Sequence, residues 1–238
     1  MLRCIAKNSQ VPPIVGFARK VVEVVSEFEA GAGGEAWKIL SDIGKRFVDR
    51  GLVVGSGGNL SMLLPDKKSF LVTGTGTQLD RLSEESFAVV GLDGTYSTEG
   101  TQPSSEYRVH LATYQGRNDV TTCIHLHPQA SVLLAALGIE TKFVTVDHVY
   151  YLRKIVRIPW IRPGTQEIAD AVAREIAGVN VLVLENHGCV VVAGNPELAF
   201  SRALNLEEAS ELSLRSRMVG IEPLEVPRAY REYLEGKG

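Results

Sequence analysis

The fold of this chain is decided by residues 123–128, which read Cys-Ile-His-Leu-His-Pro. In an extended strand, side chains two positions apart leave the same face, so His125 and His127 can direct two imidazoles at one point while Ile124 and Leu126 face the core. Pro128 cannot continue a strand ladder, so the strand is expected to end there, with both histidines at its open end. The pair suits one transition metal if a third ligand comes from elsewhere, and the alternative is a pair of hydrogen-bonded core histidines.

Length and composition favour one main domain that binds a small molecule. The chain has 238 residues, of which 45% are hydrophobic, and this is enough to bury a sizeable core. Its 25 basic and 28 acidic residues give a net charge of −3, which offers no electrostatic footprint for nucleic acid or for an anionic membrane. We therefore expect a small-molecule partner.

Cysteine usage and the first residues predict a soluble, cytoplasmic protein. Cys4, Cys123 and Cys189 lie far apart without a CxxC pair, so neither a disulfide framework nor a thiolate zinc site is indicated. The N-terminal residues contain no apolar segment of the signal-peptide type, and the longest apolar runs are too short to span a bilayer.

Hydrophobic periodicity and end signals predict a mixture of helices and strands. The expected helices are 35–50, 103–116, 129–137, 165–177 and 196–219, the last with Asn195 as N-cap and Pro196 at its first position. The expected strands are 60–64, 69–73, 87–90, 123–127, 181–184 and 190–193, and the β-branched segment 142–158 is expected to be extended. Residues 1–33 form an N-terminal extension, with a helix over 17–28 expected to pack on the domain formed by 34–238.

A third histidine follows the first strand of a second β-rich pair. His187 lies in the turn between the runs 181–184 and 190–193, and Gly188 beside it would allow a tight backbone. A turn histidine is usually only solvated, but together with the pair at 125 and 127 it becomes the obvious third metal ligand.

Several small polar residues are candidates for binding an anion. Ser104 and Ser105 lie at the start of a predicted helix, where free backbone N–H groups and the helix dipole favour negative charge, although ordinary helix capping would also explain them. The glycine-rich stretches 55–59 and 73–77 also offer amides and hydroxyls at strand ends. Neither stretch matches a P-loop or a dinucleotide fingerprint.

Five ordered motifs between residues 35 and 217 resemble the class II aldolase/adducin family. They are Gly57-Gly58-Asn59-Leu60-Ser61, Thr75-Gly76, Pro103-Ser104-Ser105-Glu106, His125-Leu126-His127-Pro128 and Asn186-His187-Gly188. The resemblance implies an α/β fold with three α/β/α layers and a mostly antiparallel central sheet. It also implies a homotetramer with its sites at subunit interfaces.

The resemblance further implies roles for individual residues. In this family a zinc ion is held by three histidines and a glutamate, which correspond to His125, His127, His187 and Glu106. Glu106 would be the fourth ligand at rest and would act as the catalytic acid or base once substrate displaces it. A pocket for the phosphate of a sugar phosphate would be formed by Gly58, Asn59, Thr75, Gly76, Ser104 and Ser105.

The segment after the histidine pair departs from the family. The aldolases of the family carry a tyrosine at the position of Val146, and it is donated toward a neighbouring subunit. Tyr150 or Tyr151 is therefore the candidate proton donor to the aldehyde, with Asp147 and His148 also close in sequence.

The implied reaction has a clear physical basis. Three neutral imidazoles leave Zn²⁺ its full charge. When a substrate carbonyl and the adjacent hydroxyl chelate this ion, the C–H or C–C bond between them becomes acidic and breaks more easily. The expected activity is reversible cleavage of a ketose 1-phosphate, of the fuculose 1-phosphate type, to dihydroxyacetone phosphate and a short aldehyde, with Glu106 moving protons. The alternatives are a sugar-phosphate dehydratase, a 4-epimerase, which is expected to carry Asp in place of Glu106, and a non-enzymatic adducin-like interaction module, which is expected to lose metal ligands.

Overall fold

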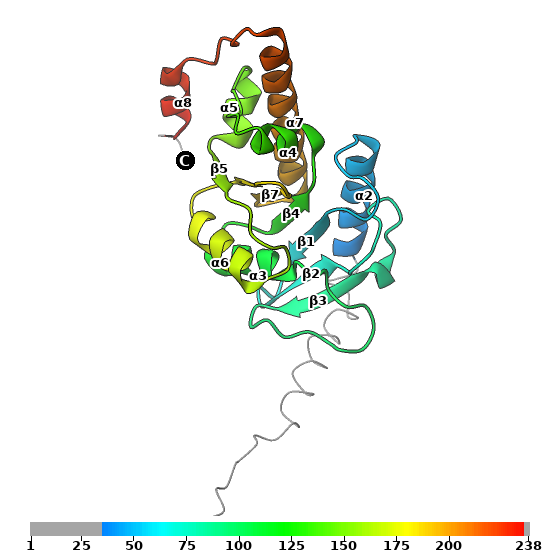
Figure 1. Ribbon diagram of the computed structural model, residues 1–238. Coiled ribbons are helices and arrows are strands. Elements are labelled where there is room, and N and C mark those ends of the chain that lie inside the picture. Colours follow the sequence, from blue (N-terminus) through cyan, green and yellow to red (C-terminus); the bar gives the residue numbers. More distant parts are fainter. Residues whose placement is uncertain (1–34, 236–238) are drawn as a thin grey trace, which may run out of the picture.

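A seven-stranded sheet forms the middle layer of the computed structural model, which describes residues 35–235 (Figure 1). In spatial order its strands are β3 (Phe87–Gly91), β2 (Ser69–Thr73), β1 (Asn59–Leu63), β4 (Thr122–Leu126), β7 (Gly188–Ala193), β6 (Val181–Leu184) and β5 (Ile155–Ile158). Every neighbouring pair is antiparallel except β5 and β6, which are parallel. The predicted mostly antiparallel sheet is confirmed, with one parallel pair at its edge.

Successive side chains of each strand enter different cores on the two faces of the sheet. In β2, Leu71 packs into the core on one face, while Phe70 and Val72 pack into the core on the other. All five residues of β2 are buried. A strand that is covered on both faces needs consecutive apolar residues, and Phe70, Leu71 and Val72 provide them.

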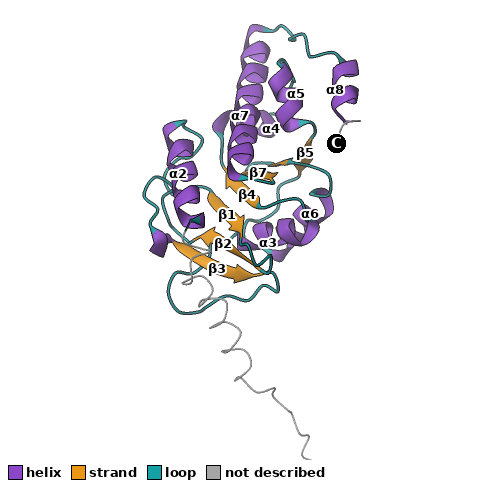
Figure 2. Ribbon diagram, turned by 180° about the vertical axis from the view of Figure 1, so that it is seen from behind, coloured by secondary structure: helices purple, strands orange, loops and turns teal. Residues whose placement is uncertain are grey.

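Helices cover both faces of this sheet, as Figures 1 and 2 show. Residues of α2 (Ala36–Asp49), α4 (Gln129–Ala136), α5 (Val146–Leu152) and α7 (Pro196–Val219) share one core, and residues of α3 (Tyr107–Gly116) and α6 (Gln166–Glu175) share the other. The predicted three-layer α/β/α arrangement is therefore confirmed. A short helix that was not predicted, α8 (Arg228–Glu235), follows α7, and its Leu234 carbonyl accepts a hydrogen bond from Arg153 at 3.4 Å.

The longest helix, α7, begins and ends where its sequence signals predict. Asn195 caps it through its side chain, Pro196 occupies its first turn, and Gly220 ends it in the left-handed conformation with φ 72°. Within α7, Glu207 accepts hydrogen bonds from the backbone amides of Ala130 and Ser131 at 2.8 and 3.0 Å. This carboxylate therefore caps α4, which follows directly after the histidine pair.

The prediction of an extended segment over 142–158 is wrong for most of its length. Residues Val146–Leu152 form α5, and only Ile155–Ile158 form a strand. Thr145 accepts a hydrogen bond from the backbone amide of His148, and Asp147 lies in the first turn, where the helix dipole favours negative charge. Because α5 packs against α7, these capping and tertiary contacts outweigh the β propensity of its valines and tyrosines.

The helix predicted to open at Pro103 begins four residues later, at Tyr107. Pro103 forms an isolated β-bridge with Gly74, and the backbone amide of Ser104 donates to the carbonyl of Thr73 at 3.0 Å. The backbone therefore still pairs with the end of β2 here. As a result, Ser104, Ser105 and Glu106 lie in a turn before α3 rather than inside its first turn.

Three further expectations concern the N-terminal extension, membrane-spanning segments and the cysteines. The extension 1–33 and its helix over 17–28 lie outside the described residues. Within residues 35–235, no helix is both long and apolar enough to cross a membrane. Cys123 and Cys189 are buried free thiols.

Candidate metal centre

Three segments that are distant in sequence bring four ligand-type side chains together at one end of β4. His125 lies on β4, and His127 comes directly after its last residue. β7 pairs antiparallel with β4, so the turn before β7, which carries His187, lies beside the end of β4. Glu106 reaches the same point from the turn that precedes α3.

The distances between the four side chains fit ligands around one ion. One nitrogen or oxygen atom from each of Glu106, His125, His127 and His187 lies within 4.8 Å of the others. The Nε2 atoms of His125 and His127 are 2.9 Å apart, and Glu106 lies 3.0 Å from His125 Nε2 and 3.2 Å from His187 Nε2. A tetrahedron with metal–ligand bonds of about 2.0–2.1 Å has edges of roughly 3.3 Å, which is close to these separations.

The backbone fixes the ring of His125 in the orientation that a metal ligand needs. Its Nδ1 lies 2.9 Å from the carbonyl oxygen of Cys189, which can only accept a hydrogen bond. Nδ1 therefore carries the proton, and the lone pair of Nε2 is directed at Glu106 and His127. In metal sites, the ring nitrogen of a ligand histidine that does not bind the metal commonly donates a hydrogen bond to a carbonyl in this way.

The electrostatics of the cluster also favour a bound cation. Burial lowers the pKa of His127 to about 4, helped by repulsion from His125 and His187, so this imidazole is neutral at physiological pH, as a ligand must be. Burial raises the pKa of the Glu106 carboxyl, but the close approach of His125 and His187 outweighs this effect and leaves that pKa below its ordinary range.

Two buried polar atoms of the cluster lack hydrogen-bond partners among the described residues. They are Glu106 Oε1 and His187 Nδ1, and the short approach of Glu106 Oε1 to His187 Nε2 does not have hydrogen-bond geometry. Such orphaned atoms are rare in protein interiors. The set of three imidazoles and one carboxylate therefore fits a divalent metal ion with nitrogen and oxygen ligands.

Glycines let the backbone pass close to the histidine rings. A Cβ atom at Gly188 would lie 2.6 Å from Cδ2 of His127 and 3.2 Å from Cε1 of His125, and one at Gly57 would lie 3.1 Å from Nδ1 of His127. The left-handed residue of the β6–β7 turn is Asn186, with φ 55°. Gly188 is therefore needed for clearance beside the rings, rather than for the tight backbone that the sequence suggested.

A buried chain of hydrogen bonds behind Glu106 was missed by the sequence analysis. Ser61 Oγ lies 2.7 Å from the Tyr114 hydroxyl and 2.6 Å from His110 Nδ1, and His110 Nε2 contacts Asn59 Oδ1. Asn59 Nδ2 in turn donates to Glu106 Oε2 at 3.5 Å. His110 had no predicted role beyond its place in the expected helix 103–116, and the signal available was that Ser61 and His110 are polar residues at core-facing positions.

Two of the three stretches predicted to bind phosphate are joined directly. Gly74 and Pro103 form the β-bridge, Thr75 Oγ1 donates to the Pro103 carbonyl at 2.8 Å, and Ser104 is tied to Thr73 through its backbone amide. The Thr75 hydroxyl is therefore already engaged as a donor, while the backbone around it is held against the Ser104 turn.

The other residues of the predicted phosphate pocket border the same region. Gly76 and Ser105 are exposed, and Gly58 lies against β4, where an added Cβ would come within 2.8 Å of the His125 carbonyl. Asn59 is buried and its amide faces Glu106. The structure thus joins Asn59 to Glu106 and Thr75 to the segment that precedes Glu106, although the Asn59 side chain is engaged by its neighbours.

The candidate proton donors lie on α5 and not in the cluster. Tyr150 is 53% exposed and stacks edge-on against Tyr151, and no hydrogen bond joins either hydroxyl to the four ligands. His148 is fully buried: its Nδ1 accepts from the backbone amide of Val144 at 3.2 Å, and its Nε2 lies 3.3 Å from Glu208. His148 therefore has a structural role in holding the start of α5.

Known proteins share both the sequence and the fold. Residues 38–214 match the family model described as the class II aldolase and adducin N-terminal domain. An L-fuculose phosphate aldolase from Methanocaldococcus jannaschii is 33% identical over 175 residues, which cover 74% of this chain and 93% of that protein. A 3-oxo-tetronate 4-phosphate decarboxylase from Haemophilus influenzae is also 33% identical, over 182 residues that cover 74% of this chain and 85% of that protein.

A solved structure of an L-fuculose 1-phosphate aldolase superposes with a TM-score of 0.78 at 27% identity, covering 85% of this chain and 95% of that one. The family match includes the segments that carry Glu106 and the three histidines. The chain therefore belongs to the class II aldolase and adducin family, and it is an enzyme of the class II aldolase type.

Proposed function

We propose that the protein catalyses the zinc-dependent, reversible cleavage of a ketose 1-phosphate, of the fuculose 1-phosphate type, to dihydroxyacetone phosphate and a short aldehyde. The observation that carries this proposal is the approach of Glu106 to His125 and His187 at 3.0 and 3.2 Å. A carboxylate at this distance can be a ligand in the resting state and a base when substrate takes its place.

His125, His127 and His187 would hold the ion, which when bound polarises the substrate carbonyl as a Lewis acid. In the direction of condensation Glu106 would take a proton from the carbon next to that carbonyl, and in the direction of cleavage it would return a proton to the same carbon. The phosphate pocket would be formed by Gly58, Asn59, Thr75, Gly76, Ser104 and Ser105. Binding of the phosphate there would fix the reacting carbon beside Glu106. Tyr150 or Tyr151 would reach the aldehyde only from a second copy of the chain.

Decarboxylation of a phosphorylated 3-oxo sugar acid is a second candidate. It is favoured by the 33% identity to the Haemophilus influenzae protein, which equals the identity to the Methanocaldococcus jannaschii aldolase. Both reactions break a bond to a carbon next to a carbonyl and leave negative charge there, so the same cluster serves either. Dehydration and 4-epimerisation are the remaining family reactions, and Glu106 stands where an epimerase is expected to carry Asp.

We also propose that the enzyme is a cytoplasmic homotetramer. The exposed apolar side chains of Val146 and Tyr150 on α5 support an interface there, because large exposed apolar groups often mark contact surfaces. The free buried thiols of Cys123 and Cys189 fit a reducing compartment.

Metal analysis followed by product analysis tests the proposal. Protein loaded with Zn²⁺ and dialysed should carry about one equivalent per chain, and His187→Ala should carry less than about half, because one of three imidazole ligands is lost. The loaded enzyme should then form a ketose 1-phosphate from dihydroxyacetone phosphate and a short aldehyde. Release of carbon dioxide from a phosphorylated 3-oxo acid, without this condensation, would instead establish the second candidate.

A further inference from the structure

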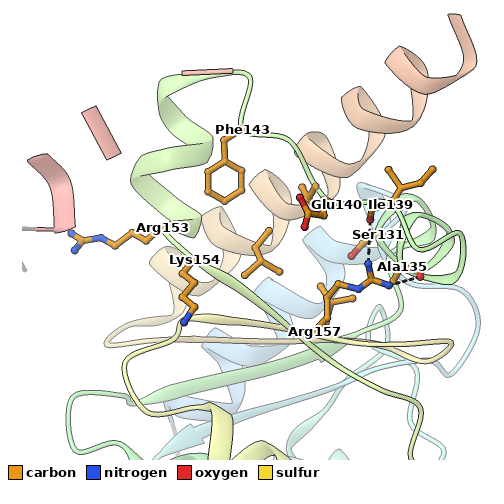
Figure 3. A pocket seen from close by; sticks show the side chains of 11 residues that line it. Ser131, Ala135, Ile139, Glu140, Phe143, Arg153, Lys154 and Arg157 are labelled. Atoms are coloured by element: carbon orange, nitrogen blue, oxygen red, sulfur yellow. Dashed lines mark hydrogen bonds between the residues drawn. The ribbon is translucent and has the colours of Figure 1, made fainter. Parts of the chain in front are cut away.

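A cavity of about 340 Å³ lies between α4, the loop before α5, and β5 (Figure 3). None of the four ligand residues lines it, so it is separate from the metal centre. Its size falls at the lower end of the range for small-molecule sites. Ser131 and the guanidinium of Arg157 lie beside one another on one side of it, while Phe143 and Lys154 form other parts of its wall, as Figure 3 shows.

Two residues that line this cavity each have a buried polar atom without a hydrogen-bond partner among the described residues. These atoms are Oγ of Ser131, a residue that is only 3% exposed, and Nε of Arg157. The same absence of partners marks Glu106 Oε1 and His187 Nδ1 in the metal cluster, where a ligand is expected. Because native structures seldom leave such atoms unpaired, their grouping in a cavity indicates a bound polar ligand.

The guanidinium of Arg157 is held in place by its other nitrogen atoms. Its Nη2 donates to the carbonyl of Ala135 at 2.6 Å and to Glu185 Oε1 at 2.9 Å. These contacts orient the planar group, and Nε is its one nitrogen without a partner among the described residues. A preorganised arginine of this kind is well suited to a carboxylate or a phosphate.

The charges around the cavity favour an anion. Arg153, Lys154 and Arg157 line it, and Glu140 is its one acidic lining residue. Lys154 is exposed and forms no ion pair with any residue in 35–235. After the pairing of Arg157 with Glu185, the lining therefore keeps an excess of positive charge. Phe143 and Ile155 add an apolar wall beside these groups.

We propose that this cavity is a second binding site, which takes a small organic anion with one carboxylate or phosphate group and a short apolar body. The oxyanion accepts hydrogen bonds from Ser131 Oγ and Arg157 Nε and lies near Lys154, and the apolar body packs on Phe143 and Ile155. The site does not depend on which reaction the metal centre catalyses.

The test uses the zinc-loaded enzyme and three brominated probes of similar shape. They are 4-bromobenzoate, 4-bromophenyl phosphate and the neutral 4-bromobenzyl alcohol. Crystals soaked with each probe are measured at the bromine edge, and dissociation constants are measured by calorimetry. We expect bromine in the cavity for at least one anion and not for the alcohol, and the two anions together show whether carboxylate or phosphate is preferred.

Variants then connect the site to its residues. Ser131→Ala and Lys154→Gln should each weaken binding of the anion by about tenfold, which is the scale of one charge-assisted hydrogen bond. The control variant Lys68→Gln removes the same charge in the β1–β2 turn and should leave binding unchanged. Ser131→Ala keeps the helix and Lys154 is exposed, so both variants should fold. The proposal is overturned if bromine appears only at the metal cluster, if the alcohol binds as tightly as the anions, or if neither variant weakens binding.

Discussion

Nε2 of His110 donates a hydrogen bond to Oδ1 of Asn59, and this contact decides which end of the Asn59 side chain faces Glu106. The direction follows from the acceptors, since the Glu106 carboxylate requires the NH₂ group of Asn59 and leaves Oδ1 for the histidine. His110 Nδ1 must then accept from Ser61, which lies 2.6 Å away. A chain of donors therefore runs from Tyr114 through Ser61, His110 and Asn59 to the carboxylate.

Replacing His110 should therefore impair turnover while leaving the metal bound. In His110→Phe the ring volume is kept, but Asn59 loses the donor that holds its orientation, so its amide can turn its oxygen toward Glu106. We expect the value of kcat to fall by about 10- to 100-fold, with zinc content near that of the wild type. Tyr114→Phe removes only the far end of the chain and should have a smaller effect. Wild-type turnover in a fully loaded His110→Phe variant would show that the chain serves stability alone.

Glu106→Gln separates a base from a mere ligand. The substitution keeps the size and shape of the side chain, and three imidazoles remain to hold zinc. Metal content and thermal stability should therefore change little. Turnover should fall on the order of 10²-fold or more, the usual scale for general acid–base catalysis. The wild type should exchange one proton of dihydroxyacetone phosphate with deuterated solvent without any aldehyde, and the variant should not. Normal exchange in the zinc-loaded variant would remove Glu106 from the mechanism.

Gly188→Ala should damage the metal centre although it adds only one methyl group. The new Cβ would lie 2.6 Å from Cδ2 of His127 and closer still to the Leu126 carbonyl, so the ring or the β6–β7 turn must move. Zinc affinity, measured by competition with a chelator, should weaken by at least about tenfold, the scale on which supporting contacts of a metal site act. The matched substitution Gly116→Ala meets only a flexible side-chain atom of Ile176 at 3.2 Å and should leave zinc affinity unchanged.

The thiols of Cys123 and Cys189 should resist alkylation until the protein unfolds. Both are fully buried, and burial raises the pKa of each thiol to about 12. The reactive form is the thiolate, so a folded pKa above the unfolded value of about 8.5 suppresses reaction throughout the range from pH 8.5 to 12. In the same range the unfolded state loses protons that the folded state keeps, so these thiols make stability fall as pH rises. Peptide mapping after iodoacetamide treatment at pH 9 should find both unmodified in native protein and modified in urea.

The sequence was most informative where a local pattern determines the geometry by itself. The spacing of His125 and His127 and the proline after them predicted a strand end with two converging rings, and the signals at Asn195 and Pro196 placed the start of α7. The class II fold was available only through the resemblance, because periodicity cannot tell which strands become neighbours. The helix α5 was missed because its capping by Thr145 and its packing on α7 outweigh a run of β-favouring residues.

The support behind the cluster could not be predicted for a related reason. Ser61 and His110 are far apart in sequence, and their 2.6 Å contact exists only because α3 packs on the face of the sheet from which the Ser61 side chain of β1 projects. Polar residues at core-facing positions gave a signal, but their partners come from tertiary structure. The cavity lined by Ser131 and Arg157 is invisible in the sequence for the same reason.

The strand order also determines when during folding the enzyme can become active. β4 is flanked by β1 and β7, and the contacts Ser61 to Cys123 and His125 to Cys189 span 62 and 64 residues of the chain. Such distant pairings form late, since the entropy of closing long loops must be overcome first. Glu106, His125 and His187 belong to three segments that meet only when both flanking strands are in place, so a partly folded or newly synthesised chain lacks the cluster that could hold a metal ion. A misfolded molecule should therefore be unable to bind the metal ion on which the activity of the native protein is proposed to depend.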